Sequence, residues 1–206
     1  NITPTERTAT QLFAEDFTQY ACDYAAGEKG GYFKVQIKDA NGNPLANKTI
    51  AVGFNGVVGY YQSDAEGWIQ KQIALANAGE YTFASIFLGD ENYTASFIVN
   101  KITIVKKPTS ISASAKSYKA SASKKSFSAT LKTIAGSSID GKVYLSAGKK
   151  ITFTVNGKTY TAKTDSKGKA TVNLKLTKKG KYTLKVSFAG DNTYKASSKS
   201  VKITIK

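Results

Sequence analysis

The stretch GKYTLKVSFAGDNTYKASSKSVKITI, residues 180–205, decides the fold of this chain. Apolar and polar residues alternate from Tyr182 to Phe188, which is the period of a half-buried β-strand. A Gly-Asp-x-x-Tyr loop then interrupts the alternation at residues 190–194. We interpret this loop as a corner where a tyrosine pins one connection between strands.

The same stretch occurs earlier in the chain, so the chain contains an internal repeat. Residues 79–104, GEYTFASIFLGDENYTASFIVNKITI, align with it at an offset of 101, and the alignment extends without a gap over 54–105 and 155–206. Upstream, residues 33–38 align with 127–132 at a smaller offset, which predicts a short insertion near 134–147 in the second copy. We therefore predict two domains.

The predicted domains are residues 1–105, which carry an extra amino-terminal segment, and residues 106–206. They meet at Lys106-Lys107-Pro108-Thr109, where the proline restricts Lys107 to extended conformations. We expect a short, stiff junction between them.

Each copy is predicted to be a β-sandwich. Outside the first 30 residues no stretch has helical spacing, and alternating runs such as 170–176 are separated by short polar turns. The turns fall at 39–42, 156–157, 165–168 and 178–180. Several short strands at regular intervals in about a hundred residues indicate an antiparallel sandwich.

Several of these motifs carry a family resemblance. The segments 38–45, 164–170 and 190–197 resemble prokaryotic immunoglobulin-like repeats, which build the stalks of invasin- and intimin-like surface proteins. The lysine-rich second copy looks especially similar to repeats of methanogenic archaeal adhesin-like proteins. The resemblance implies an all-β fold of two tandem immunoglobulin-like antiparallel β-sandwich domains. It also implies an extracellular, cell-surface location with further repeats on either side.

The composition excludes most catalytic chemistry. With no His and one Cys, the chain has no imidazole base, no Cys/His zinc site and no Ser-His-Asp triad. No phosphate-binding loop and no acid–base carboxylate pair stands out, so we expect no catalytic residues, no metal and no cofactor. No apolar run approaches 18 residues, so no membrane span is expected either. We expect Cys22 to be a buried thiol in a strand; the alternative is one half of a Cys-Gln thioester, as some surface adhesins form.

Charge separates the two copies. Residues 1–105 hold 7 Lys/Arg against 11 Asp/Glu, a net of −4, whereas residues 106–206 hold 23 Lys against 3 Asp, a net of +20. The lysines lie on the polar phase of strands or in turns, which indicates either a well-solvated stalk or electrostatic adhesion to an anionic wall or polysaccharide. The second copy has no Arg, so no specific nucleic-acid partner is expected.

Four large apolar residues of the first copy are predicted to face outward. By the alignment Trp68, Tyr60, Ile86 and Leu88 fall on Lys169, Thr161, Ser187 and Ala189. We predict that these four contact a ligand, as a sugar-stacking platform or as a protein interface. The alternative is that the segment 13–24 packs over them as an additional strand or short helix.

The alignment also predicts an internal crosslink in the first copy. Lys71 falls on Val172 and Asn100 on Val201, which are inward positions. A buried lysine and asparagine could form an isopeptide bond, of a kind known in surface adhesins that this chain resembles, with Asp16 or Asp23 as the assisting carboxylate. The alternative is a strand slip or bulge that turns Lys71 outward.

Three sequons predict candidate glycosylation sites in the first copy. They begin at Asn1, Asn47 and Asn92. Such sites would place sugars on the surface of the first copy.

The sequence thus predicts a non-enzymatic, monomeric fragment of a cell-surface adhesin-like protein. It would space and present an adhesive surface that contacts a cell-wall polysaccharide or a surface protein of another cell. The alternative is a carbohydrate-binding module pair attached to a wall-active enzyme, whose catalytic domain would lie elsewhere.

Overall fold

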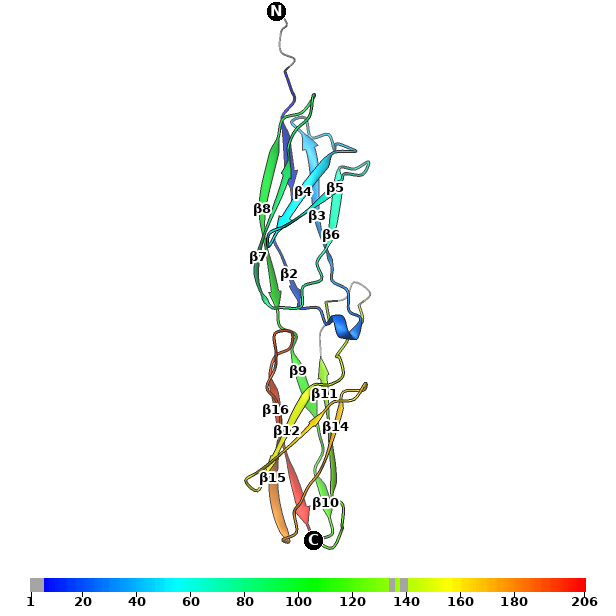
Figure 1. The fold of residues 1–206 in the computed structure, drawn as a ribbon, viewed down its shortest axis with the longest axis vertical. Coiled ribbons are helices and arrows are strands. Elements are labelled where there is room, and N and C mark those ends of the chain that lie inside the picture. Colours follow the sequence, from blue (N-terminus) through cyan, green and yellow to red (C-terminus); the bar gives the residue numbers. More distant parts are fainter. Residues whose placement is uncertain (1–5, 134–135, 138–140) are drawn as a thin grey trace, which may run out of the picture. The chain divides into compact units, whose positions relative to one another are not determined.

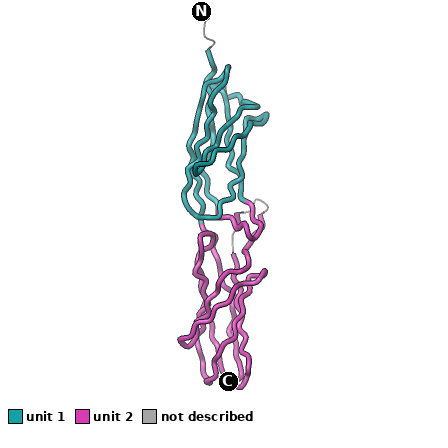
Figure 2. The backbone as a smooth tube through the Cα atoms, in the orientation of Figure 1, with its two compact units in different colours: residues 1–19, 30–105 teal, residues 20–29, 106–206 magenta. Residues whose placement is uncertain are grey.

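The computed structural model describes residues 6–133, 136–137 and 141–206, and these residues form strands joined by short loops (Figure 1). The chain divides into two compact units, coloured separately in Figure 2. Unit 1 comprises residues 1–19 and 30–105, and unit 2 comprises residues 20–29 and 106–206. The sequence placed residues 20–29 in the first copy, whereas the structure groups them with the second unit.

The described part of unit 1 is a sandwich of two sheets. A three-stranded sheet has the order β1-β3-β6 and a five-stranded sheet has the order β2-β8-β7-β4-β5. The strands are β1 (Thr10–Phe13), β2 (Phe17–Tyr20), β3 (Tyr32–Asp39), β4 (Thr49–Phe54), β5 (Val57–Gln62), β6 (Trp68–Gln72), β7 (Gly79–Phe87) and β8 (Ser96–Val105).

Unit 2 repeats this topology. Its sheets have the orders β9-β11-β14 and β10-β16-β15-β12-β13, which match unit 1 strand for strand. The strands are β9 (Thr109–Ser112), β10 (Lys116–Tyr118), β11 (Ser126–Thr133), β12 (Lys150–Val155), β13 (Lys158–Lys163), β14 (Lys169–Asn173), β15 (Gly180–Phe188) and β16 (Ser197–Ile205). The prediction of an all-β chain with two antiparallel sandwiches is confirmed. The insertion predicted near 134–147 lies partly outside the described residues.

The amino-terminal segment is not extra to the domain. It supplies β1 and β2, which correspond to β9 and β10 of unit 2, and the single helical turn in it is the 3-10 turn η1 (Tyr24–Ala26). The sequence alignment missed β1 and β2 because strands of three or four residues are too short to show alternation. Of the segment 13–24, residues 13–17 line a hollow together with Trp68, whereas residues 20–24 group with unit 2.

The core of each unit follows the predicted alternation. In β14 and β15 the inward residues Ala170, Val172, Leu184 and Val186 are buried. Between the sheets of unit 1, Phe33 from β3 and Phe83 from β7 pack edge to face, with ring centroids 5.3 Å apart. Phe127 from β11 and Phe153 from β12 form a similar pair in unit 2, at 6.1 Å.

The Gly-Asp-x-x-Tyr loop forms a corner in unit 2. Asp191 Oδ1 accepts hydrogen bonds from the backbone N–H groups of Thr193 and Tyr194, and Lys149 Nζ lies 2.8 Å from Asp191 Oδ2. Gly190 has φ +80°, and a Cβ at this position would lie 2.8 Å from the backbone nitrogen of Ala196, so only glycine fits. The Tyr194 ring is fully buried below the Lys149 ammonium.

The corner of unit 1 has the same backbone geometry but a different tyrosine environment. Asp90 again caps the loop, and Lys48 Nζ lies 2.6 Å from its carboxylate. The hydroxyl of Tyr194 donates hydrogen bonds to Asp23 and to the carbonyl of Tyr144, whereas among the described residues the hydroxyl of Tyr93 has no such partner. The two corners therefore provide a matched pair for mutation.

We predict that Tyr194→Phe lowers the free energy of unfolding of unit 2 by about 2 kcal/mol, because Asp23 loses a buried donor. Tyr93→Phe should change that of unit 1 by less than about 0.5 kcal/mol. Urea unfolding of the full chain measures both. Trp68 fluorescence follows unit 1, which holds the only tryptophan, and circular dichroism follows both units. Equal effects of the two changes would contradict the prediction.

Candidate ligand-contacting faces of unit 1

The outer face of the five-stranded sheet in unit 1 is apolar. Its residues form two rows across β5, β4, β7 and β8, and we call them the apolar face. The rows are Tyr60–Ala51–Ile86–Phe97 and Val58–Gly53–Ala84–Val99. Tyr60 and Phe97 are 72% and 75% exposed, so large rings stand in solvent at opposite ends of one row.

The same register positions in unit 2 are polar. The rows there are Thr161–Thr152–Ser187–Ser198 and Thr159–Thr154–Lys185–Ser200. The two units share strand order and inward packing, so the fold itself does not require apolar residues at these outward positions. An apolar face that the fold does not require is a candidate contact surface.

Leu88 and the apolar face border a shallow hollow. Its volume is about 340 Å³, and its lining includes Ala51, Tyr60, Ile86, Leu88, Asn47 and Asp90. Ala51 lies between the larger side chains of Tyr60 and Ile86 in its row, which opens the depression. Three of the predicted contact residues, Tyr60, Ile86 and Leu88, thus lie together.

Trp68 lies on the other sheet, which the sequence did not predict. It belongs to β6, and its row across the three-stranded sheet is Phe13–Gln36–Trp68. The equivalent row in unit 2 is Ser112–Thr130–Lys169. Sequence alternation distinguishes inward from outward but not one outer face from the other, so it could not separate Trp68 from Ile86.

The turn before β6 fixes the direction of Trp68. Asp64 Oδ1 accepts from the backbone N–H of Trp68 at 2.8 Å, and Gly67 has φ +80°. A Cβ on Gly67 would lie 2.5 Å from the carbonyl oxygen of Ile37, so the turn needs glycine. Ile69 then points into the core and Trp68, 39% exposed, points outward.

Trp68 and Tyr60 nevertheless line one open hollow, between β5 and β6. Its volume is about 910 Å³, and its lining includes Tyr60, Trp68, Lys34, Gln62, Asp64 and Gln70. Three aromatic residues, Tyr60, Tyr61 and Trp68, supply apolar contact area, and two amides, a carboxylate and an ammonium supply hydrogen-bond donors and acceptors. We call this the aromatic hollow. Its chemistry suits a ligand with both C–H faces and hydroxyl groups.

The predicted partners Lys71 and Asn100 each bind another group. Lys71 pairs with Phe33 at a strand position that faces the core, but its side chain is only half-buried. Its Nζ donates a hydrogen bond to the Tyr61 hydroxyl at 3.1 Å. The Asn100 amide donates to Asp16 Oδ1 at 3.2 Å, and its Oδ1 is buried without a partner among the described residues. The structure thus brings Asn100 to Asp16, and the bond between Lys71 and Asn100 stays a prediction.

Two of the three sequons are exposed. Asn47 and Asn92 lie on the surface of unit 1, and Asn47 borders the 340 Å³ hollow. Asn1 lies outside the described residues. Glycosylation of these three asparagines stays a prediction.

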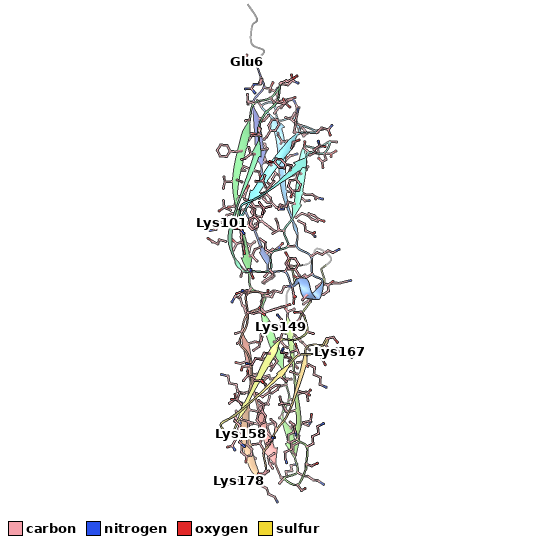
Figure 3. All side chains as sticks on the ribbon, viewed as in Figure 1. Glu6, Lys101, Lys149, Lys158, Lys167 and Lys178 are labelled. Atoms are coloured by element: carbon pink, nitrogen blue, oxygen red, sulfur yellow. The ribbon has the colours of Figure 1, made fainter. Side chains whose placement is uncertain are left out.

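The exposed lysines of unit 2 lie in turns or at the strand positions that the alternation predicts to face solvent. Lys158, Lys167 and Lys178 are exposed, and Figure 3 labels them on the ribbon of this unit. Lys107 and Lys125 are the exceptions, since both are buried. Sequence reasoning missed Lys107 because it treated residues 106–109 as a linker.

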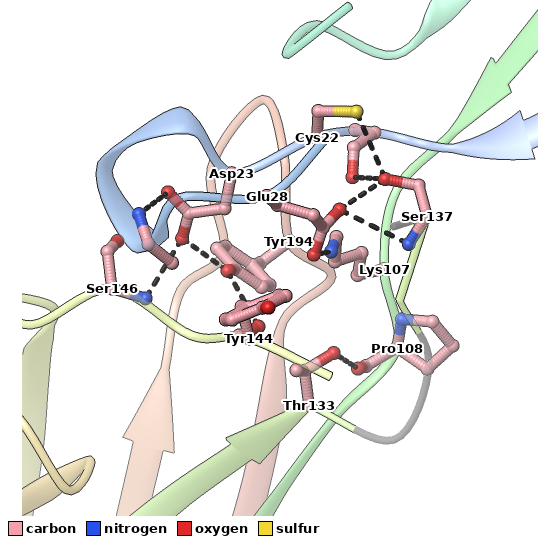
Figure 4. Close-up of polar contacts among 12 residues, drawn as sticks. Cys22, Asp23, Glu28, Lys107, Pro108, Thr133, Ser137, Tyr144, Ser146 and Tyr194 are labelled. Carbon is pink, nitrogen blue, oxygen red and sulfur yellow. Dashed lines mark hydrogen bonds and ion pairs between the residues drawn. The ribbon is translucent and has the colours of Figure 1, made fainter. Parts of the chain in front are cut away.

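Lys107 belongs to a buried polar cluster of unit 2, drawn in Figure 4. Its ammonium pairs with Glu28 Oε2, and both side chains are 0% exposed. Ser137 donates to Glu28 Oε1 through its hydroxyl and, at 3.2 Å, through its backbone N–H. Cys22 is buried, its Sγ lies 3.1 Å from Ser137 Oγ, and burial raises the pKa of the thiol.

Asp23 and Tyr194 form the second half of this cluster. Burial opposes ionisation of Asp23, but hydrogen bonds from Tyr194, Ser146 and Ala26 outweigh it and hold the pKa of the carboxyl below its usual value. Burial and the Asp23 carboxylate raise the pKa of the Tyr194 hydroxyl. No cluster of three or more metal-ligating side chains occurs among the described residues.

No helix in the described ranges is long and apolar enough to cross a membrane. No family model matches the chain, and no curated protein matches it.

Several solved structures, in contrast, are similar to this chain. Invasin, a bacterial integrin-binding protein, aligns with 94% of this chain and 39% of its own, with 17% identity and a TM-score of 0.52. This chain therefore spans about two-fifths of the invasin structure. The D0–D1 domain of intimin aligns over 95% of this chain and 97% of its own (16% identity, TM-score 0.34), and the Yersinia pseudotuberculosis adhesin InvE over 95% and 58% (14%, 0.37).

The likeness to invasin shows the fold alone, and the other two likenesses, with TM-scores below 0.5, carry no further conclusion. Together with the sheet topology of the two units, it confirms the prediction of tandem immunoglobulin-like sandwiches. The archaeal part of the resemblance stays a prediction.

We predict that Trp68 fluorescence is red-shifted and quenched by acrylamide in the folded chain, because the indole borders an open hollow. Trp68 is the only tryptophan, so emission and quenching report on this side chain alone. A blue-shifted emission that resists acrylamide would show a buried indole and contradict the assignment.

Proposed function

We propose that this chain is a non-enzymatic fragment of a cell-surface adhesin-like protein. Unit 1 presents the adhesive surface, which contacts cell-wall glycans or a surface protein of another cell, and unit 2 acts as a well-solvated spacer. The observation that carries the proposal is the difference in residue type at equivalent outward positions of the two units. Positions that hold Tyr, Trp, Phe, Ile and Val in unit 1 hold Thr, Ser and Lys in unit 2.

A glycan is the ligand that the aromatic hollow favours. Aromatic side chains in sugar sites pack against C–H groups, and amide and carboxylate groups bind the hydroxyls. Tyr60 and Trp68 provide the first kind of contact, and Gln62, Asp64 and Gln70 provide the second. A protein partner would instead be expected to cover the flatter apolar face.

The aromatic hollow also supports a second function, a carbohydrate-binding module pair attached to a wall-active enzyme. Both functions use the same sugar contacts, so the composition of the full-length protein distinguishes them. A catalytic domain encoded beside these repeats would favour the enzyme-linked function, and further repeats of this kind would favour the adhesin.

We expect the full chain to bind members of a cell-wall glycan array and Trp68→Ala or Tyr60→Ala to weaken this binding about tenfold, as the loss of one stacking contact predicts. The matched controls are Lys169→Ala and Thr161→Ala, at the same register positions of unit 2. They should change the dissociation constant by less than about twofold. Wild-type binding that both ring deletions leave unchanged would overturn the assignment of the hollow.

A chain that binds no glycan of the array but binds intact cells would show a protein ligand. In that case Phe97→Ser and Ile86→Ser, which introduce the residues of unit 2, should reduce cell binding.

Unit 2 is expected to bind anionic polymers through charge alone. The net of +20 over residues 106–206 comes from lysines, and screening shortens their range as salt rises. Retention of the full chain on an acidic polysaccharide resin should be measurable at low ionic strength and lost at about 0.5 M salt. Retention that persists at high salt, or none at low salt, would contradict this expectation.

A further inference from the structure

We propose that unit 2 contains an internal amide bond between Lys107 Nζ and Glu28 Cδ, formed by loss of one water. This site is separate from Lys71 and Asn100 of unit 1. It is also independent of ligand binding, because none of its residues lines the hollows of unit 1.

The two reacting groups are in direct contact and shielded from water. Lys107 Nζ lies against Glu28 Oε2, and neither side chain has any exposed surface (Figure 4). Because both side chains are fully buried, no water competes with the lysine nitrogen for the carboxyl carbon of Glu28. The neutral amine is the nucleophile that amide formation requires.

The two oxygens of Glu28 have different surroundings. Oε1 accepts from the Ser137 hydroxyl and from the Ser137 backbone N–H, whereas Oε2 faces the lysine. When the amine adds to Cδ, negative charge develops on Oε1, where two donors already point. The geometry therefore retains Oε1 as the amide oxygen and releases Oε2.

The step balances without any co-reactant. The Lys107 ammonium gives one proton to Glu28 Oε2, and the nitrogen lone pair then forms the bond to Cδ. The Cδ–Oε2 bond breaks, and Oε2 takes a second proton from the nitrogen and leaves as water. No atom is oxidised or reduced.

The surrounding backbone holds both residues in place. The Lys107 N–H donates to the carbonyl of Thr193, and its own carbonyl accepts from Lys195, both at 2.8 Å, beside the Tyr194 corner. The Glu28 N–H donates to the carbonyl of Asp23 at 3.1 Å, and the Asp23 side chain is held by Tyr194. Fixed positions on both sides favour reaction over separation.

Unit 1 provides an internal comparison. Its backbone makes the same contacts at Thr8, whose N–H donates to Asn92 and whose carbonyl accepts from Thr94. Threonine has no amine, so the equivalent position of unit 1 cannot form this bond. The proposed bond is specific to unit 2.

Intact mass spectrometry of the denatured full chain tests the proposal. We expect a mass below that of the sequence by one water. Trypsin should then release residues 8–29 linked to residues 107–116, since cleavage follows Arg7, Lys29, Lys106 and Lys116, and Pro108 blocks cleavage after Lys107. A mass equal to the sequence, or a water loss located in other peptides, overturns the proposal.

Two variants and a control complete the test. Lys107→Met and Glu28→Leu keep apolar bulk in the cluster, and each should show the full mass of its own sequence. Lys149→Ala removes the solvent-reaching ion pair to Asp191 and should retain the water loss. A Lys71–Asn100 bond would instead remove ammonia, so the two crosslinks are distinguished by mass alone. Water loss that persists in Lys107→Met or Glu28→Leu would also overturn the assignment.

Discussion

Packing of the two sheets against each other is the interaction on which everything else in each unit depends. Phe33 against Phe83 in unit 1 and Phe127 against Phe153 in unit 2 anchor inward side chains that alternate with outward ones. Once the inward positions are apolar, the outward positions contribute little to the core and are free to vary. The two units use this freedom in opposite ways, and their difference in function is expected to lie there.

Burial of charge is the second constraint, and among the residues that the structure describes it acts only in unit 2. Lys107 could not remain fully buried without an anion, so Glu28 and the rest of residues 20–29 are required to complete this unit. Those residues lie between β2 and β3 of unit 1 in the sequence. Residues 106–206 alone would leave an unpaired ammonium in the interior, and a domain boundary drawn between 105 and 106 would separate the two charges.

The sequence was sufficient for features that repeat or alternate. The offset of 101, the alternation in residues 182–188 and the Gly-Asp-x-x-Tyr corner predicted two sandwiches with the observed inward residues. It was insufficient where the outcome depends on which strands become neighbours. Trp68 and Ile86 have the same outward phase but lie on different sheets, and Glu28 meets Lys107 from 79 positions away, with no motif at either residue. Such contacts are set by topology rather than by local pattern.

A glycan on Asn47 would affect the two hollows of unit 1 differently. Asn47 is exposed and borders the smaller hollow beside Ile86 and Leu88, so a glycan attached there would occupy the space that a ligand needs. The aromatic hollow has no sequon residue in its lining, and Tyr60 forms a wall of both. Attached sugar would thus cover part of the apolar face, where exposed Leu88 otherwise favours aggregation, and leave Trp68 accessible. Of the two hollows, the aromatic hollow is therefore the proposed ligand site that is compatible with either state of Asn47.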